Sequence, residues 1–267
     1  MRLKLTIEYA GTKYSGWQVQ QNARTVQGEI ERALREGAGA ERFELYGSGR
    51  TDAGVHALAQ VAHLEIPGSG PPETLRRRVN EALPSDINIL RIEKAAPRFH
   101  ARHDAVARSY IYQVSRRRTA FAKPFVWWVK DACDAALMRE AAQAFVGFHD
   151  FRAFSDDDPG AKSTTVQLES FDVHEDDDLI VLHIEASHFL WKMVRRLVGV
   201  LVEVGRGQVP LKDVAGLLEA DPRKIAPLTA PASGLFLERV YYPGDRRDLP
   251  IQSAVRVGVA HDSAYDA

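Results

Sequence analysis

Apolar and polar residues alternate from the first residues of the chain. Leu3, Leu5, Ile7 and Tyr9 are separated by charged or hydroxyl residues, and this period of two predicts a half-buried strand. Further runs with strand-like patterning occupy residues 43–46, 58–64, 87–92, 106–115, 166–174, 179–186 and 235–242. The runs before and after the acidic residues 175–178 are expected to pair as a hairpin.

Apolar residues at spacings of three and four predict the helices. Thr25 is typical of an N-cap residue, so a helix is expected to begin there and to end at residue 36, before Gly37. Asp134 is expected to cap a second helix, which runs through residue 145. The remaining predicted helices cover residues 73–83, 190–204 and 211–219, and the one at 190–204 is strongly apolar.

The elements follow the order strand, helix, strands, helix, strand, and then roughly the same series again. This order favours an α/β (α+β) fold. We expect two similar α/β halves whose mostly antiparallel, mixed sheets join into one extended sheet, with a cleft between the halves. The expected boundaries are an N-terminal half at 1–104, a C-terminal half at 105–244 and a flexible tail at 245–267.

Length and composition are those of an ordinary globular protein. The chain has 267 residues, 45% of them hydrophobic, which is enough for one large domain or two small ones. No apolar run approaches the roughly 20 residues needed to cross a bilayer, and the first residues lack the layout of a signal peptide. Cys133 is the only cysteine, which excludes an intrachain disulfide and a thiolate metal cluster. A cytoplasmic location is expected.

Charge is strongly segregated, although the net charge is only −1. Residues 98–118 hold six arginines against one acid, Asp104, with aromatic side chains among them. Residues 156–178 hold nine acids against one base, Lys162. Arginines mixed with aromatic residues favour contact with a nucleic acid. The acidic run is interpreted as a solvated face.

Residues 47–57 read Gly-Ser-Gly-Arg-Thr-Asp-Ala-Gly-Val-His-Ala and lie between two predicted strands. The glycines permit a sharp turn, and Arg50 and Asp52 stand two positions apart. A neighbouring guanidinium lowers the pKa of a carboxyl group, so we expect Asp52 to be an ionised nucleophile or base. On spacing alone, Asp-Ala-Gly is more often just a surface turn.

This stretch closely resembles the Arg-Thr-Asp-x-Gly-Val-His-Ala signature of the TruA family of tRNA pseudouridine synthases. Further matches occur in the family's order: Gly-Thr-x-Tyr-x-Gly-Trp-Gln at 11–18 with Thr-Val-Gln-Gly at 25–28, Phe-His-Ala-Arg at 99–102 with Arg-Ser-Tyr-x-Tyr at 108–112, Met-Val-Arg at 193–195 with Val-Gly at 198–199, and Ala-x-Gly-Leu-x-Leu at 232–237. The chain departs from the family pattern at Ala10 and Val166, where the family often has Asp and Arg.

The resemblance implies a tRNA pseudouridine synthase that modifies positions 38–40 of the anticodon stem-loop, as a homodimer and without cofactor or metal. The reaction breaks the bond between ribose C1′ and uracil N1 and rejoins the base through C5. Asp52 is then the nucleophile, by attack on C1′, addition to C6 or removal of the 2′ proton. Arg50 and Arg195 are the cations expected to keep Asp52 ionised and oriented.

The resemblance also implies which residues hold the substrate. Tyr110 is the platform for the loose uracil, and its phenol is a candidate acceptor for the C5 proton. Leu237 lines the uracil pocket, and Arg108 and His56 bind the substrate. On spacing alone, a tyrosine in a strand is more often simply packed in the sheet, and for Leu237 a place in the plain core is nearly as consistent as a place in the pocket. The target uridine must be flipped out of its stem, and the arginines at 76–78 and in the basic run are candidates for contact with that stem.

Three other functions compete with this interpretation. His183 and Glu185, with His188 nearby, offer ligands for a metal hydrolase or zinc deaminase. The deaminase pattern also needs a pair of cysteines, and alternation places His183 and Glu185 on the solvent side of their strand. A catalytically silent RNA-binding module is disfavoured because the expected catalytic residues are all present. A phosphate-binding enzyme is the third alternative, and it is disfavoured because the glycines at 47–49 lack the Gly-Lys-Ser/Thr ending of a phosphate-binding loop.

Overall fold

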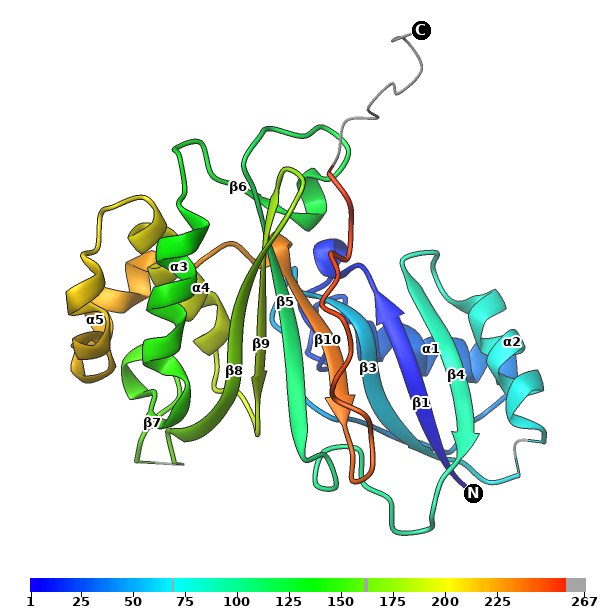
Figure 1. Cartoon of the computed structure of the whole chain (residues 1–267). Helices are drawn as coiled ribbons and strands as arrows, with labels where there is room; N and C mark the ends of the chain where they lie inside the picture. The colour runs from blue at the N-terminus through cyan, green and yellow to red at the C-terminus, as the bar shows by residue number, and fades with distance from the viewer. Residues whose placement is uncertain (69, 161–162, 258–267) are drawn as a thin grey trace, which may run out of the picture.

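The computed structural model describes residues 1–68, 70–160 and 163–257, and its ten strands form one broad, twisted sheet (Figure 1). The strands are β1 (Arg2–Tyr9), β2 (Glu44–Gly47), β3 (His56–Glu65), β4 (Ile87–Lys94), β5 (Ala107–Ser115), β6 (Trp127–Trp128), β7 (Gly147–Asp150), β8 (Thr165–Asp176), β9 (Leu179–Ala186) and β10 (Leu235–Tyr241). Their order is β4-β1-β3-β10-β5-β9-β8-β7, with β2 paired to β3 and β6 paired to β5. The predicted α/β fold with one extended, mostly antiparallel mixed sheet is confirmed.

The helices cover the two ends of the sheet, α1 and α2 at one end and α3, α4 and α5 at the other (Figure 1). They are α1 (Val26–Ala38), α2 (Pro72–Ala82), α3 (Ala135–Ala142), α4 (Met193–Gly205) and α5 (Pro222–Ile225). Short 3₁₀ turns occupy Gly11–Lys13, Lys123–Phe125, Gln143–Phe145, Arg152–Phe154, Leu211–Asp213, Ala215–Glu219, Ala226–Leu228 and Ala232–Gly234.

The last strand of the chain, β10, lies in the middle of the sheet. Leu237 is the register partner of Ala57 on β3, in a parallel pair, and of Tyr110 on β5, in an antiparallel pair. The strand therefore joins the sheet of the N-terminal half to that of the C-terminal half.

Each half has its own core. In the N-terminal half, Ile30 and Leu34 of α1 and Val79 of α2 are fully buried against β1, β3 and β4. In the C-terminal half, α3 packs against β8 and against α4, and the buried residues of both helices share one core with those of β8 and β9. Tyr110 packs against both cores, which places it where the halves meet.

Helix boundaries differ from the predicted ones where a left-handed residue intervenes. Helix α1 continues through Gly37 and ends at Ala38, because the C-cap residue Gly39 has a φ of +65°. Helix α4 begins at Met193 rather than at residue 190, because Lys192 has a φ of +64°. The helix expected at 211–219 is two 3₁₀ turns. The N-caps Thr25 and Asp134 are confirmed by side-chain hydrogen bonds from backbone N–H groups of α1 and α3.

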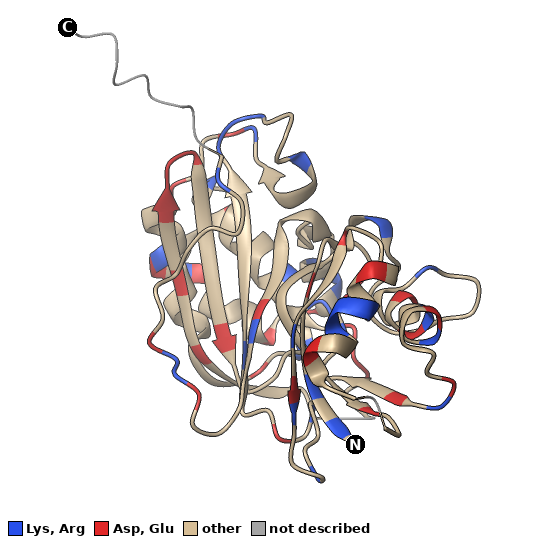
Figure 2. Cartoon of the chain, turned by 90° about the vertical axis from the view of Figure 1, so that its right-hand side faces the viewer, with Lys and Arg blue, Asp and Glu red and all other residues tan. Residues whose placement is uncertain are grey.

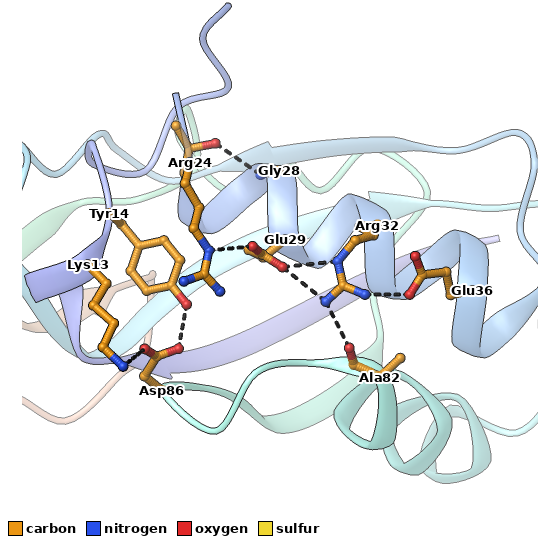
Figure 3. Close-up of polar contacts among 10 residues, drawn as sticks. Lys13, Tyr14, Arg24, Gly28, Glu29, Arg32, Glu36, Ala82 and Asp86 are labelled. Atoms are coloured by element: carbon orange, nitrogen blue, oxygen red, sulfur yellow. Dashed lines mark hydrogen bonds and ion pairs between the residues drawn. The ribbon is translucent and has the colours of Figure 1, made fainter. Parts of the chain in front are cut away.

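A chain of ion pairs fixes the loop before α1 to both helices of the N-terminal half (Figure 3). Arg24 contacts Glu29 at 2.6 Å, and Glu29 also accepts from Arg32 at 3.0 Å. Arg32 donates in turn to the carbonyl oxygen of Ala82 at the end of α2. Tyr14, in the same loop, donates to Asp86 just before β4. The loop is therefore held at several points.

Residues 245–257, which we expected to belong to a flexible tail, run back against the sheet. Gln113 of β5 accepts hydrogen bonds from the backbone N–H groups of Ala254 and Val255, at 2.6 and 3.1 Å. Val257 is buried, and Arg247 is paired with Glu169 and with Glu185. The rest of the expected tail, residues 258–267, lies outside the described residues.

This C-terminal segment corrects the expectation that His183 and Glu185 face solvent. Both side chains are buried because the segment lies over their strand. His183 is 2.9 Å from a carboxylate oxygen of Glu238, and Glu185 is 2.9 Å from Arg247. Among the described residues, no group of three or more His, Cys, Asp or Glu side chains is placed to hold a metal ion.

The basic and acidic runs partly neutralise each other. Arg116 and Arg117 pair with Glu175 and Asp178 at the tip of the β8–β9 hairpin, and Figure 2 shows acidic and basic segments side by side there. These two arginines are therefore poor candidates for contact with a polyanion. Arg98 and Arg102 are exposed and remain candidates.

Candidate active site around Asp52

The loop that carries Asp52 rests on the loop between β1 and α1. The Thr51 hydroxyl is 2.8 Å from the Tyr9 hydroxyl, and the Thr51 carbonyl oxygen accepts from the backbone N–H of Trp17 at 3.1 Å. Gly16, with a φ of +90°, lies so close that a Cβ there would be 2.5 Å from the same carbonyl oxygen. The Gly-Thr-x-Tyr-x-Gly-Trp-Gln stretch therefore supports the Asp52 loop.

Asp52 itself opens a tight turn. Its carbonyl oxygen accepts from the backbone N–H of Val55 at 3.2 Å, and Gly54 has a φ of +79°, which favours glycine. The interpretation of Asp-Ala-Gly as a turn is thus correct. It does not exclude a chemical role, because the turn leaves the side chain of Asp52 30% exposed.

Arg195 of α4 reaches Asp52 from the C-terminal half. Its Nη1 lies 3.7 Å from Oδ2 of Asp52, and its Nε donates to the carbonyl oxygen of Ala230 at 2.7 Å. Gly199, one turn further along α4, allows this approach, because a side chain there would collide with the carbonyl oxygen of Leu228. The Met-Val-Arg match at 193–195 and the Val-Gly match at 198–199 therefore act together: the first supplies Arg195, and the second allows the close packing of α4 that positions it.

Burial decides the pKa of Asp52. Desolvation raises the pKa above its ordinary value, and the charges of Arg195 and Lys192 only partly oppose it. The sequence led us to expect a lowered pKa, because the neighbouring arginine was visible and the burial was not. The carboxylate is therefore poorly solvated, which makes it more reactive once it is ionised.

Arg50 and His56 do not contact Asp52. Arg50 is exposed and forms no ion pair with Asp52 within the described part of the chain. The His56 ring is buried, with Nε2–H donating to the Pro124 carbonyl oxygen and Nδ1 accepting from the Gly11 N–H, both at 3.0 Å. Burial lowers the pKa of His56, which keeps the ring neutral. His56 thus supports the loop at Gly11 and has no ring nitrogen left for a substrate.

Tyr110 and Leu237 are cross-strand partners on β5 and β10. The Tyr110 ring is half-buried and lies edge-to-face against Phe189, with centroids 5.0 Å apart. Burial raises the pKa of Tyr110 well above its ordinary value, and the charge of Asp52 adds to the shift. Leu237 is buried in the N-terminal core. The resting phenol is therefore protonated.

Arg108 is bound entirely by carbonyl oxygens. It donates to Arg102 at 2.9 Å, to Ser187 at 3.0 Å, and to Ser48 and Ala105 at 3.3 Å. It forms no ion pair with any described residue, and burial lowers its pKa. Its positive charge is thus held beside the Asp52 loop without a neutralising carboxylate.

Sequence reasoning missed two acids that position this site. Asp156 pairs with Lys192 at 2.7 Å and with the buried Arg196, and Asp157 accepts from the backbone N–H of Trp191 at 2.9 Å. We had interpreted them as part of a solvated acidic face. The sequence did contain a signal for this role, the cluster of cations at 192–196. A buried cation must be paired with an acid, so such a cluster beside an apolar helix predicts acidic partners nearby.

None of the described helices is both long enough and apolar enough to cross a membrane.

Comparison with known proteins places these observations in a family. A family model described as tRNA pseudouridine synthase matches residues 5–104 and 141–243. The chain is 43% identical over 244 residues to "tRNA pseudouridine synthase A" of Rhodopseudomonas palustris (strain BisA53), covering 90% of this chain and 99% of the relative. It is 42% identical over 246 residues to the protein of the same name from Brucella ovis, covering 90% and 98%. It is 37% identical over 244 residues to "tRNA pseudouridine synthase A 2" of Clostridium tetani, with the same coverage.

Proposed function

The chain belongs to the TruA family of tRNA pseudouridine synthases, and on that premise we propose that it isomerises uridines at positions 38–40 of the anticodon stem-loop, with Asp52 as nucleophile on a flipped-out base. The observation that carries the proposal is the pair of Asp52 and Arg195, 3.7 Å apart and contributed by different halves. A carboxylate that is 30% exposed is open to a ligand, and here it lies beside a fixed cation. The homodimer and the cytoplasmic location implied by the resemblance belong to the same proposal.

The reaction needs no co-reactant. The C1′–N1 bond breaks, a C1′–C5 bond forms, the proton of C5 leaves to a base, and N1 gains a proton. The ionised oxygen of Asp52 serves each of the three routes, since attack on C1′, addition to C6 and removal of the 2′ proton all need an anion beside the ribose. Retaining glycosidases use a carboxylate on C1′ in the first of these ways.

Tyr110 supplies the platform for the detached uracil in this proposal. Base stacking on an aromatic ring contributes about 1–3 kcal/mol. Its raised pKa keeps the phenol from ionising in the resting enzyme, so the phenol takes the C5 proton only if a cation stabilises the phenolate. Arg108 is the cation whose charge favours that phenolate. Leu237, the cross-strand partner of Tyr110, is almost fully buried and supports the apolar side of this proposed uracil site.

Tyr110→Phe is expected to retain folding and tRNA affinity while turnover falls by about 10²-fold, the usual contribution of a proton-transfer group. The measurement is single-turnover tritium release from tRNA labelled at uracil C5, with tRNA affinity determined in parallel. Turnover within about twofold of wild type would remove the phenol from the mechanism and leave Tyr110 only its stacking role.

Affinity for tRNA is expected to fall steeply with salt. Contacts from the exposed Arg98 and Arg102 to two phosphates predict a loss of about 7- to 12-fold between 50 mM and 200 mM salt. Arg98→Ala should make the slope of log affinity against log salt shallower, by the amount that about one phosphate contact contributes. Arg116→Ala is the matched control, because Arg116 is already paired with Glu175, and its slope should equal that of wild type. Equal slopes for all three proteins would contradict this placement of the RNA.

The proposed function is tested with purified protein and an unmodified tRNA transcript. Pseudouridine is located by carbodiimide labelling and primer extension. We expect product at one or more of positions 38–40 and none when those uridines are replaced by cytidine. Modification elsewhere in the tRNA, with positions 38–40 untouched, would overturn the assignment of the substrate site.

A further inference from the structure

Trp191 is an exposed aromatic residue beside the candidate active site. It lies just before α4, one helical turn ahead of Arg195, and its side chain is 51% exposed. Single exposed aromatic residues are ordinary in proteins and usually need no explanation. Trp191 is different because its backbone and its ring are both held in place.

The backbone of Trp191 is fixed from both sides by the acids before β8. Its N–H donates to the carboxylate of Asp157 at 2.9 Å, and its carbonyl oxygen accepts from the N–H of Asp156 at 3.3 Å. The next residue, Lys192, adopts a left-handed φ of +64°, which is unfavourable for a residue with a long side chain. Such a conformation persists where the surroundings enforce it, and these conformations concentrate at ligand sites.

The ring of Trp191 is held through Lys192. The ammonium group lies 5.0 Å from the ring centroid and 2.7 Å from a carboxylate oxygen of Asp156. Asp156 is anchored in turn by Arg196, which is only 2% exposed. Two further nitrogens of Arg196, Nε and Nη1, have no hydrogen-bond partner among the described residues. A cation thus lies over the indole ring, and about half of the residue, 51%, remains exposed to a flat ligand.

We propose that Trp191 is a base-stacking residue of the substrate site, on which the nucleotide next to the target uridine stacks with the indole face opposite Lys192. This inference rests on the proposed function. A uridine that is flipped toward Asp52 leaves its neighbour without a stacking partner, and an aromatic ring beside Asp52 can replace that partner. The Lys192 ammonium also favours the phosphates that flank the stacked base.

The competing role for Trp191 is a purely local one. The Trp191 side chain is one of the groups that lower the pKa of the Asp52 carboxyl group, a role that needs its indole N–H. Phenylalanine separates the two roles, because it keeps a stacking ring and has no N–H.

The test compares Trp191→Ala, Trp191→Phe and the control Trp128→Ala, which removes a tryptophan that is 42% exposed on β6. The probe is a tRNA stem-loop with 2-aminopurine beside the target uridine, whose fluorescence is quenched when the base stacks on an aromatic ring. Trp191→Ala should abolish the extra quenching and weaken binding by about 5- to 150-fold. Trp191→Phe should retain most of both, and Trp128→Ala should match wild type.

Two outcomes would overturn the inference. In the first, Trp191→Ala quenches and binds like Trp128→Ala. In the second, Trp191→Phe and Trp191→Ala both bind normally and both shift the acidic limb of the pH–rate profile, which would assign the indole to Asp52 alone. Thermal unfolding of each variant identifies a folding defect. The binding measurements need no turnover, so a wild-type protein that stacks the probe but forms no pseudouridine would refute the proposed function and not the stacking.

Discussion

Asp52→Asn is expected to abolish isomerisation while leaving tRNA binding intact. Loss of a nucleophile lowers turnover by roughly 10⁴-fold or more, because the amide cannot supply the anion that all three routes need. The amide has nearly the same shape as the carboxylate, so the turn closed by Gly54 and Val55 is preserved. The measurement is tritium release from tRNA labelled at uracil C5, together with a filter-binding affinity for the same tRNA.

Asp52→Asn is also expected to be more stable than wild type at neutral pH, and this gain shows that a loss of activity is not a loss of folding. Burial places the pKa of Asp52 in the fold above its unfolded value. The stability from this group is therefore fully present below the unfolded pKa and is lost as the pH rises through the folded pKa. An uncharged amide avoids that loss, so at neutral pH the variant should unfold at a higher temperature than wild type. Tritium release by Asp52→Asn at the wild-type rate would refute the role of the carboxylate.

Arg195→Ala is expected to give the second-largest effect, a loss of about 10³-fold in turnover at neutral pH. Arg195 opposes the desolvation that raises the pKa of Asp52. Without it the pKa rises further, and a larger share of the enzyme carries the protonated, inactive acid. The acidic limb of the pH–rate profile should therefore move to higher pH. The measurement is kcat/KM across the acidic range for wild type and variant.

Arg50→Ala is the matched comparison, because the family signature includes this arginine although it forms no ion pair with Asp52 among the described residues. Its acidic limb should coincide with that of wild type, whatever its effect on affinity. Arg195→Lys should keep the limb near its wild-type position but recover only part of the turnover, since a lysine cannot hold the Ala230 carbonyl oxygen and Asp52 in the same geometry. An unchanged limb in Arg195→Ala would show that another cation tunes Asp52.

Local patterns predicted the elements of the fold well, because their causes are local. Alternation gave β1, and the caps Thr25 and Asp134 were identified from residue type alone. The place of β10 between β3 and β5 could not be predicted, because pairing between strands far apart in sequence leaves no periodic signal. The left-handed Lys192 shortened α4 for a similar reason, since its conformation is imposed by contacts with distant acids.

The chemistry of the site was predicted unevenly. Asp52 and Arg195 came from motif resemblance, and their 3.7 Å separation depends on two halves packing together. The sign of the pKa shift of Asp52 was wrong because a neighbouring charge can be read from a sequence and a degree of burial cannot. His56 was assigned to the substrate, yet its hydrogen bonds to Gly11 and Pro124 serve the scaffold.

The central position of β10 also has a consequence for synthesis of the protein. A ribosome makes β3 and β5 well before it reaches Leu235–Tyr241, so both strands keep an unpaired edge while the segment between β5 and β10 is made. Open edges are templates for pairing with other chains. The nascent protein therefore gains the geometry around Asp52 and its protection from aggregation in the same late event, once β10 has been made and has paired with both strands.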